Sequence, residues 1–124
     1  MMTKEEIYNA FNGKISRTAI IDRGGEYVVQ GKYCIAAPEE DSIWDVWVCN
    51  PKNISAGLSQ KRVNSTLSAL QGCDKRPIRV LTGEGWVKVA GTEKIIANLA
   101  PLGIPRKRKI SPEQPEAITR RNTN

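Results

Sequence analysis

The stretches GLSQKRVNSTLSALQG (residues 57–72) and IRVLTGEGWVKV (residues 78–89) decide the fold. In the first stretch, Ser59 is a suitable N-cap, and Gly72 suits the left-handed position that ends a helix. Apolar residues recur between them at the spacing of one helical face, at Val63, Leu67 and Leu70. The second stretch contains two β-favouring runs around a glycine-rich turn. We therefore predict a helix followed by a two-stranded antiparallel ribbon.

The opposite face of the predicted helix is polar. Its side chains are cations and short donors and acceptors, namely Lys61, Arg62, Asn64, Ser65 and Ser68. Side chains of these types contact phosphates and base edges. Residues 56–59 also resemble the turn of a helix-turn-helix, although the preceding residues 50–55 are short for a first helix. The alternative interpretation is a helix whose polar face is only solvated.

The predicted ribbon carries cations as well. Gly83 suits the first central position of a two-residue type II′ turn. This register places Arg79 opposite Lys88, and like charges directly opposite each other destabilise a sheet. A phosphate lying across the two cations would offset this cost, and Trp86 beside them could stack on a base. Alternatively, both cations extend into water and Trp86 belongs to the core.

Further strands and two short helices are expected in the rest of the chain. A capping box at Thr3 opens one helix, and Thr92 begins another. Strands are predicted on both sides of Gly24-Gly25, at residues 33–37 and at residues 43–49. In the last of these strands, large apolar side chains alternate to both faces. We therefore expect this strand to be central and covered on both sides.

These elements predict an α+β fold, with an antiparallel sheet of short hairpins and about three short helices packed on it. One globular domain is expected over residues 1–104, followed by a basic tail at residues 105–124 whose composition favours disorder. A winged helix-turn-helix, with residues 78–89 as the wing, is the alternative. Strands within residues 33–50 would favour the α+β sheet, and a helix there would favour the winged helix.

The basic character of the chain favours polyanionic partners. The net charge is +6 and the pI is about 9.4. Residues 104–124 contain six Lys or Arg and only two Asp or Glu, so most of the excess charge lies in the tail. The cations outside the helix and ribbon that we expect to contact nucleic acid are Arg76, Arg106, Lys107, Arg108 and Lys109. The alternative is a tail that only increases solubility.

Several classes of chemistry are excluded by composition. The chain has no histidine and no CxxC spacing, which excludes a zinc finger and histidine-dependent nucleophiles. Three widely spaced cysteines indicate a reducing, cytoplasmic setting, where we expect them to be small core residues. We expect no cofactor, no metal and no membrane segment. Glu39-Glu40-Asp41 could hold a cation but is more typical of a solvated turn, and Asp45 is expected in an ion pair.

The primary hypothesis is a small nucleic-acid-binding protein without enzymatic activity, with DNA favoured over RNA. The alternative is a protein-interaction module of a phage or mobile element. Such a module would cover the nucleic-acid-handling surface of a host complex, as anti-restriction and anti-CRISPR inhibitors do. Its small size, the lack of a catalytic constellation and the aromatic strand around Trp44 and Trp47 favour this alternative. The sequence does not indicate the oligomeric state.

Overall fold

A computed structural model describes residues 1–70 and 77–107. Six strands form one antiparallel sheet in the order β1-β2-β3-β4-β6-β5. The strands are β1 Ile20–Arg23, β2 Glu26–Gln30, β3 Cys34–Pro38, β4 Ile43–Val48, β5 Pro77–Leu81 and β6 Glu84–Ala90. The helices are α1 Lys4–Ala10, α2 Gln60–Ala69, α3 Glu93–Ala97 and α4 Leu99–Leu102, with single 3-10 turns at Arg17–Ala19 and Glu40–Ser42. The expected α+β fold is confirmed.

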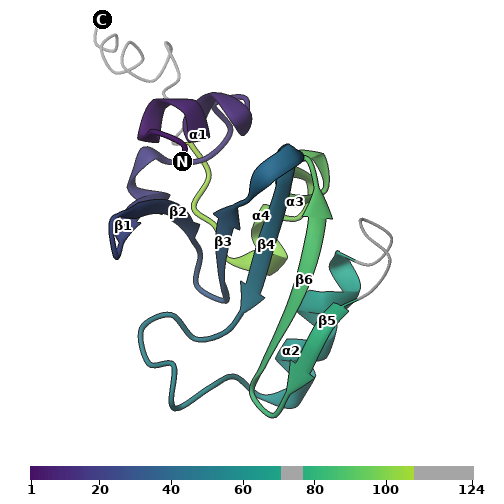
Figure 1. Cartoon of the computed structure of the whole chain (residues 1–124). Helices are drawn as coiled ribbons and strands as arrows, with labels where there is room; N and C mark the ends of the chain where they lie inside the picture. Colours follow the sequence, from purple (N-terminus) through teal and green to yellow (C-terminus); the bar gives the residue numbers. More distant parts are fainter. Residues whose placement is uncertain (71–76, 108–124) are drawn as a thin grey trace, which may run out of the picture.

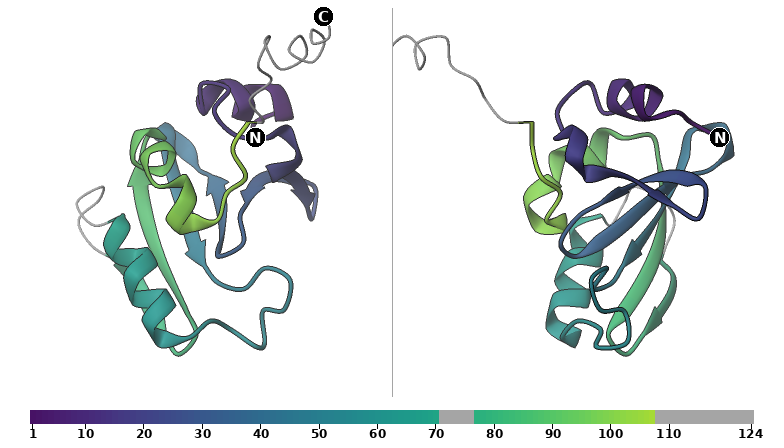
Figure 2. Two further views of the ribbon diagram at one scale, coloured as in Figure 1. Left: turned by 180° about the vertical axis from the view of Figure 1, so that it is seen from behind. Right: turned by 90° about the vertical axis from the view of Figure 1, so that its left-hand side faces the viewer.

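The sheet has one covered face and one open face. Helices α2, α3 and α4 lie behind the sheet in Figure 1 and in front of it in the left panel of Figure 2. We call this side the covered face and the other side the open face. Within the described residues, no helix packs across the open face. The strand at residues 43–49 was expected to be covered on both sides, and among the described residues helices cover only one of its faces.

The core lies between the covered face and the helices. On β4, the buried side chains of Trp44, Val46 and Val48 alternate with half-buried side chains on the open face. This alternation matches the two faces predicted from the sequence, and β4 is central between β3 and β6. Helix α1 adds Phe11, whose ring meets Trp44 edge to face at 5.1 Å between centroids. Edge-to-face contact is a preferred geometry of aromatic pairs.

Helix α2 begins and packs as its sequence predicts. The backbone N–H of Arg62 donates to the Ser59 hydroxyl oxygen at 3.1 Å, and this bond caps the helix. The apolar stripe is buried against the covered face. Residues 50–56 form turns rather than a first helix, and residues 33–50 supply β3 and β4. These strands favour the α+β sheet over the winged helix-turn-helix. Gly72 lies outside the described residues.

The β5–β6 hairpin has a different register from the predicted one. Its turn spans two residues, and Gly83 takes the second central position with φ +84° instead of the first. Strand β6 begins two residues earlier than expected, so Arg79 pairs with Trp86. Lys88 pairs instead with Asp45 of the neighbouring strand β4. The expected opposition of two cations therefore does not form.

The C-terminal helical segment and the segment that follows it pack on the N-terminal part of the chain. The helix expected from Thr92 is divided at Asn98 into α3 and α4. The Thr92 hydroxyl donates to the Ala10 carbonyl at 2.7 Å instead of capping α3. Beyond α4, the Ser16 N–H donates to the Pro105 carbonyl at 2.8 Å. The first residues of the expected tail thus run beside residues 14–16. In the described parts of the chain, no helix has both the length and the apolar character needed to cross a membrane.

Candidate interaction face

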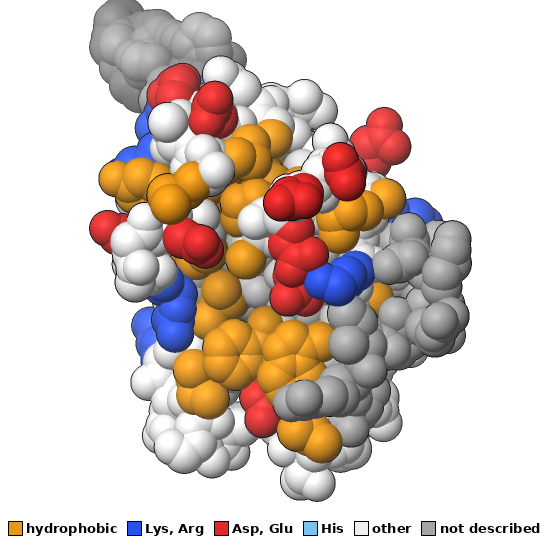
Figure 3. All heavy atoms as spheres, in the orientation of Figure 1, with side chains coloured by type: hydrophobic (Ala, Val, Ile, Leu, Met, Phe, Trp, Pro, Cys, Tyr) orange, Lys and Arg blue, Asp and Glu red, His pale blue; other side chains and the backbone are white. Residues whose placement is uncertain are grey.

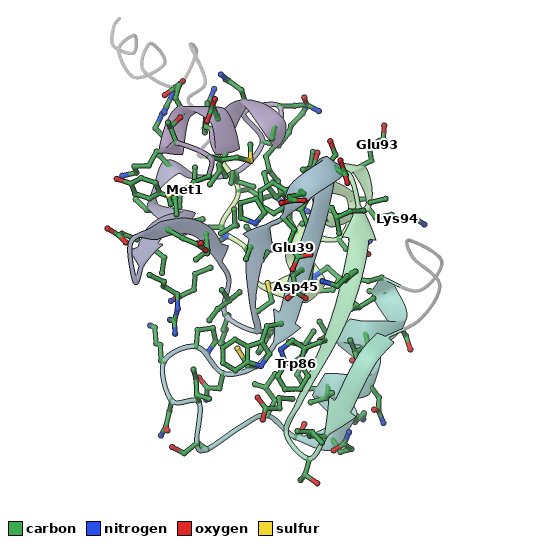
Figure 4. The ribbon with its side chains drawn as sticks, viewed as in Figure 1. Met1, Glu39, Asp45, Trp86, Glu93 and Lys94 are labelled. Carbon is green, nitrogen blue, oxygen red and sulfur yellow. The ribbon has the colours of Figure 1, made fainter. Side chains whose placement is uncertain are left out.

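Two tryptophans form the centre of the open face. Trp47 on β4 and Trp86 on β6 are register partners, and their rings are stacked with centroids 5.8 Å apart and planes within 9°. Both side chains are half-buried. The Trp47 indole Nε1–H donates to Glu84 Oε1 at 2.9 Å, which fixes the ring that supports Trp86. Figure 4 shows Trp86 on this side of the sheet.

A second, small apolar cluster continues the aromatic pair across β3 and β2. Its buried members are Val28, Ile35 and Cys49. Ile35 is the register partner of Trp47, so the cluster adjoins the stacked rings. In Figure 3 hydrophobic side chains gather at the centre of this face. The members of this cluster are buried, so the apolar surface that the open face offers to solvent comes from half-buried side chains around it, such as Trp47.

Carboxylates border the aromatic pair. Lys88 Nζ lies 2.7 Å from Glu39 Oε1 in an ion pair that is partly exposed, so the lysine charge is compensated. Asp45, the register partner of Lys88, has a buried oxygen, Oδ1, without a hydrogen-bond partner in the described structure. In Figure 4, Glu39 and Asp45 lie near each other above Trp86. Glu84, which accepts from Trp47, lies on β6 two positions before Trp86, whereas Lys88, the partner of Asp45, lies two positions after it. The aromatic pair therefore has acidic neighbours in both directions along the strands.

The environment of Asp45 favours its neutral form. Burial raises the pKa of this carboxyl above its ordinary value, because desolvation penalises the charged form. The positive charge of Lys88 opposes the rise, and the negative charge of Glu39 adds to it. A cation brought to this position by a partner would act in the same direction as Lys88. It would favour the carboxylate form of Asp45.

The residues predicted to contact nucleic acid fall into separate groups. Exposed polar side chains of α2 form one group, namely Lys61, Asn64, Ser65 and Ser68. Because α2 covers the opposite face of the sheet, this group does not share a surface with Trp86 and Lys88. Arg106 and Lys107 are exposed beside residues 14–16. Arg76, Arg108, Lys109 and the side chain of Arg79 lie outside the described residues.

Arg62 takes part in a contact that the sequence did not predict. Its guanidinium carbon lies 4.2 Å from the centroid of the Tyr33 ring, and Lys32 Nζ lies 5.6 Å from the same centroid. Cations from α2 and from the β2–β3 connection thus approach one aromatic ring, in contacts of cation–π type. Tyr33 and Lys32 carry no distinctive spacing, so no local sequence signal identified them.

The other candidate sites contain no reactive constellation in the described residues. No group of three or more potential metal-ligating side chains is present in residues 1–70 and 77–107. Cys34 and Cys49 are buried, and burial raises the pKa of each thiol to about 12. The prediction that these two cysteines are core residues is confirmed. Cys73 lies outside the described residues.

No protein-family model matches the chain, and no curated protein or solved structure matches it significantly.

Proposed function

We propose that this protein is a protein-interaction module that binds a basic surface of a partner protein through the open face of its sheet. The stacked, half-exposed pair of Trp47 and Trp86 carries the proposal. Tryptophan is the residue type most enriched at the energetic centres of protein interfaces. Here the pair is fixed by strand pairing and by Glu84, so little side-chain freedom remains to be lost on binding.

The charge of the partner follows from the groups around the tryptophans. Glu39 and Glu84 bring carboxylates to this face, Glu39 in an ion pair with Lys88, and the carboxyl group of Asp45 lies beside them. Such a border repels the phosphates of nucleic acid and attracts Lys and Arg side chains. Proteins that handle nucleic acid carry basic surfaces of this kind. This geometry favours the inhibitor-type module over direct nucleic-acid binding at the open face.

Affinity capture with matched variants tests the proposal. The tagged full chain is incubated with nuclease-treated extract of cells in which the protein acts. We expect a stoichiometric protein partner, recovered equally by wild type and by the covered-face control Lys61→Ala. Loss of a tryptophan at an interface centre lowers affinity by about 30-fold, so Trp86→Ala should recover little.

The proposal fails if recovery is the same for Trp86→Ala and wild type, or if the partner is lost after nuclease treatment. Urea unfolding of each variant must first show that Trp86→Ala remains folded. Asp45→Asn provides a milder change at the same face, since it prevents formation of the carboxylate and keeps the shape of the side chain. Its recovery should fall between those of wild type and Trp86→Ala.

Nucleic-acid binding on another surface is the second candidate, and one observation favours it. Arg62 and Lys32 approach the same Tyr33 ring from two different elements. Exposed Lys61 lies beside Arg62 on α2. A gel-shift titration at low salt would show binding that weakens with added salt and with Arg62→Ala, but not with Trp86→Ala. Absence of any shift at low salt would eliminate this candidate.

A further inference from the structure

A cavity of about 400 Å³ lies where three connections meet. The end of β2 and the β2–β3 connection contribute Gln30 and Lys32, and the loop after β4 contributes Asn50 and Lys52. The segment after α4 closes the third side with Gly103 and Pro105. This volume is within the range of small-molecule sites in proteins. None of these residues belongs to the tryptophan pair.

Close backbone packing builds the wall of this cavity. The Lys32 N–H donates to the Gly103 carbonyl at 2.9 Å, and the Tyr33 N–H donates to the Leu102 carbonyl at 3.2 Å. Gly103 has φ +72°, and a Cβ there would lie 2.6 Å from the Lys32 Cβ. A Cβ on Gly31 would lie 2.6 Å from the Leu102 carbonyl oxygen. Only glycine permits this approach, so Lys32 is held against the end of α4.

The charged groups that line the cavity are both positive. Lys32 and Lys52 are the charged residues of the lining, and no Asp or Glu is among them. The Lys32 ammonium group lies 5.6 Å from the centroid of the Tyr33 ring. Among the described residues, neither ammonium group is within ion-pair distance of a carboxylate. A second cavity of about 400 Å³ has the opposite character, because Glu26, Glu39 and Glu40 line it. The charged residues that line the two cavities are therefore opposite in sign.

Two residues of the lining carry carboxamides whose oxygens each accept a hydrogen bond from the chain. Gln30 Oε1 accepts from Arg23 Nη1 at 3.5 Å, and Asn50 Oδ1 accepts from the Asn53 N–H at 3.3 Å. Because the chain already uses these oxygens, the amide nitrogens are the groups that remain for a ligand. Two ammonium groups and two amide donors suit an anion with several acceptor oxygens. A phosphate group has this form.

We propose that the cavity binds a phosphomonoester, with Lys32 and Lys52 at the phosphate and with Gln30 and Asn50 donating to its oxygens. The ligand is a nucleotide or the phosphorylated end of a nucleic acid, which share this group. The site is independent of the tryptophan face, so either proposal can fail without the other. Arg106 and Lys107 directly follow Pro105 at the cavity wall and add positive potential.

Amide NMR titration of the ¹⁵N-labelled full chain at low salt tests this site. The probes are inorganic phosphate, adenosine 5′-monophosphate, and one short oligonucleotide with a 5′-phosphate or a 5′-hydroxyl. We expect the amides of Gly31, Lys32, Asn50 and Gly103 to shift with saturation. Tighter binding of the monophosphate than of phosphate indicates a nucleotide, and preference for the 5′-phosphorylated oligonucleotide indicates a nucleic-acid end.

Matched charge variants separate the cavity from general attraction to a basic protein. Lys32→Met and Lys52→Met should each weaken binding about tenfold, because each removes a charge-assisted contact. The control Lys94→Met removes an exposed lysine of α3 that does not line the cavity, and binding should remain as in wild type. The proposal is overturned if no probe shifts these amides. It is also overturned if Lys32→Met and Lys94→Met weaken binding equally.

Discussion

Trp47 and Trp86 lie on adjacent strands, 39 positions apart in the chain, and stack with their planes within 9°. Antiparallel pairing of β4 with β6 makes them direct neighbours on the open face. Both side chains are half-buried, and Trp47 also packs against the small apolar cluster of Val28, Ile35 and Cys49. The face that carries it also carries the carboxylates of Glu39, Asp45 and Glu84. This combination is the basis of the proposed protein contact.

The stacked pair should contribute to stability as a coupled unit. A double-mutant cycle with Trp47→Ala, Trp86→Ala and the double variant isolates their interaction. We expect a coupling of about 1 kcal/mol in urea unfolding, as is typical of aromatic pairs. Trp47→Phe keeps a ring but removes the donor to Glu84, and it should retain part of this coupling. Additive effects of the two single substitutions would contradict the stacking.

Asp45 should make stability depend on pH. Because burial raises its pKa in the folded protein, the folded state holds the proton more tightly than the unfolded chain. Its stabilising contribution is therefore complete below the unfolded pKa of about 3.9. This contribution is lost as the pH rises through the higher folded pKa. Between the unfolded and the folded pKa of Asp45, Asp45→Asn should therefore gain stability relative to wild type as the pH rises. The difference in urea midpoint between the two proteins at each pH measures this gain.

Lys88→Met serves as the control for the pH dependence attributed to Asp45. Removal of the lysine charge eliminates the effect that lowers the Asp45 pKa, so the transition should move to higher pH. A difference between wild type and Asp45→Asn that stays constant from acid to neutral pH would show that Asp45 titrates alike in both states. In that case burial would not perturb the Asp45 carboxyl.

Thr66 offers a test of the packing of α2. Its side chain is 1% exposed, and its hydroxyl has no hydrogen-bond partner in the described structure. Thr66→Val replaces the hydroxyl with a methyl group of similar shape, and we expect a gain of about 1 kcal/mol. For a chain of this length the melting temperature should rise by about 4 °C. Thr66→Ser keeps the hydroxyl but removes the methyl group, so this variant should be less stable than wild type. If Thr66→Val were less stable than wild type, the Thr66 hydroxyl would have a hydrogen-bond partner.

The buried cysteines should resist thiol reagents. Burial raises the pKa of Cys34 and Cys49 to about 12, so little thiolate is present at neutral pH. In a Cys73→Ser background, Ellman's reagent should not react with the native protein. Both thiols should react after unfolding in guanidinium. Rapid reaction of one equivalent with the native protein would show that a cysteine is accessible.

Local features of the fold could be predicted from the sequence. The Thr3 capping box, the Ser59 cap and the turn at Gly24-Gly25 depend on residues within a few positions of each other. The two faces of β4 also follow from alternation along a single strand. Each of these features arises from backbone or side-chain chemistry within one element. Such chemistry can be read without knowledge of the partners of that element.

The candidate site could not be predicted, because it depends on non-local pairing. The register of the β5–β6 hairpin depends on the exact position of the turn. The observed turn pairs Arg79 with Trp86 instead of the predicted Lys88. Lys88 meets Glu39, which is 49 positions away in the sequence. Strands β4 and β6 are separated in the sequence by α2 and β5, and the tryptophan stack forms only because these two strands pair. A single sequence does not specify which strands become neighbours.

Site-specific photo-crosslinking tests directly whether the open face is the contact surface. A benzophenone amino acid is placed at Leu81, which is 45% exposed and pairs with Glu84, or at exposed Lys61 on α2. After irradiation in nuclease-treated extract, we predict a protein adduct from the Leu81 position and none from the Lys61 position. An adduct that forms at Lys61 and not at Leu81 would contradict the proposed contact face.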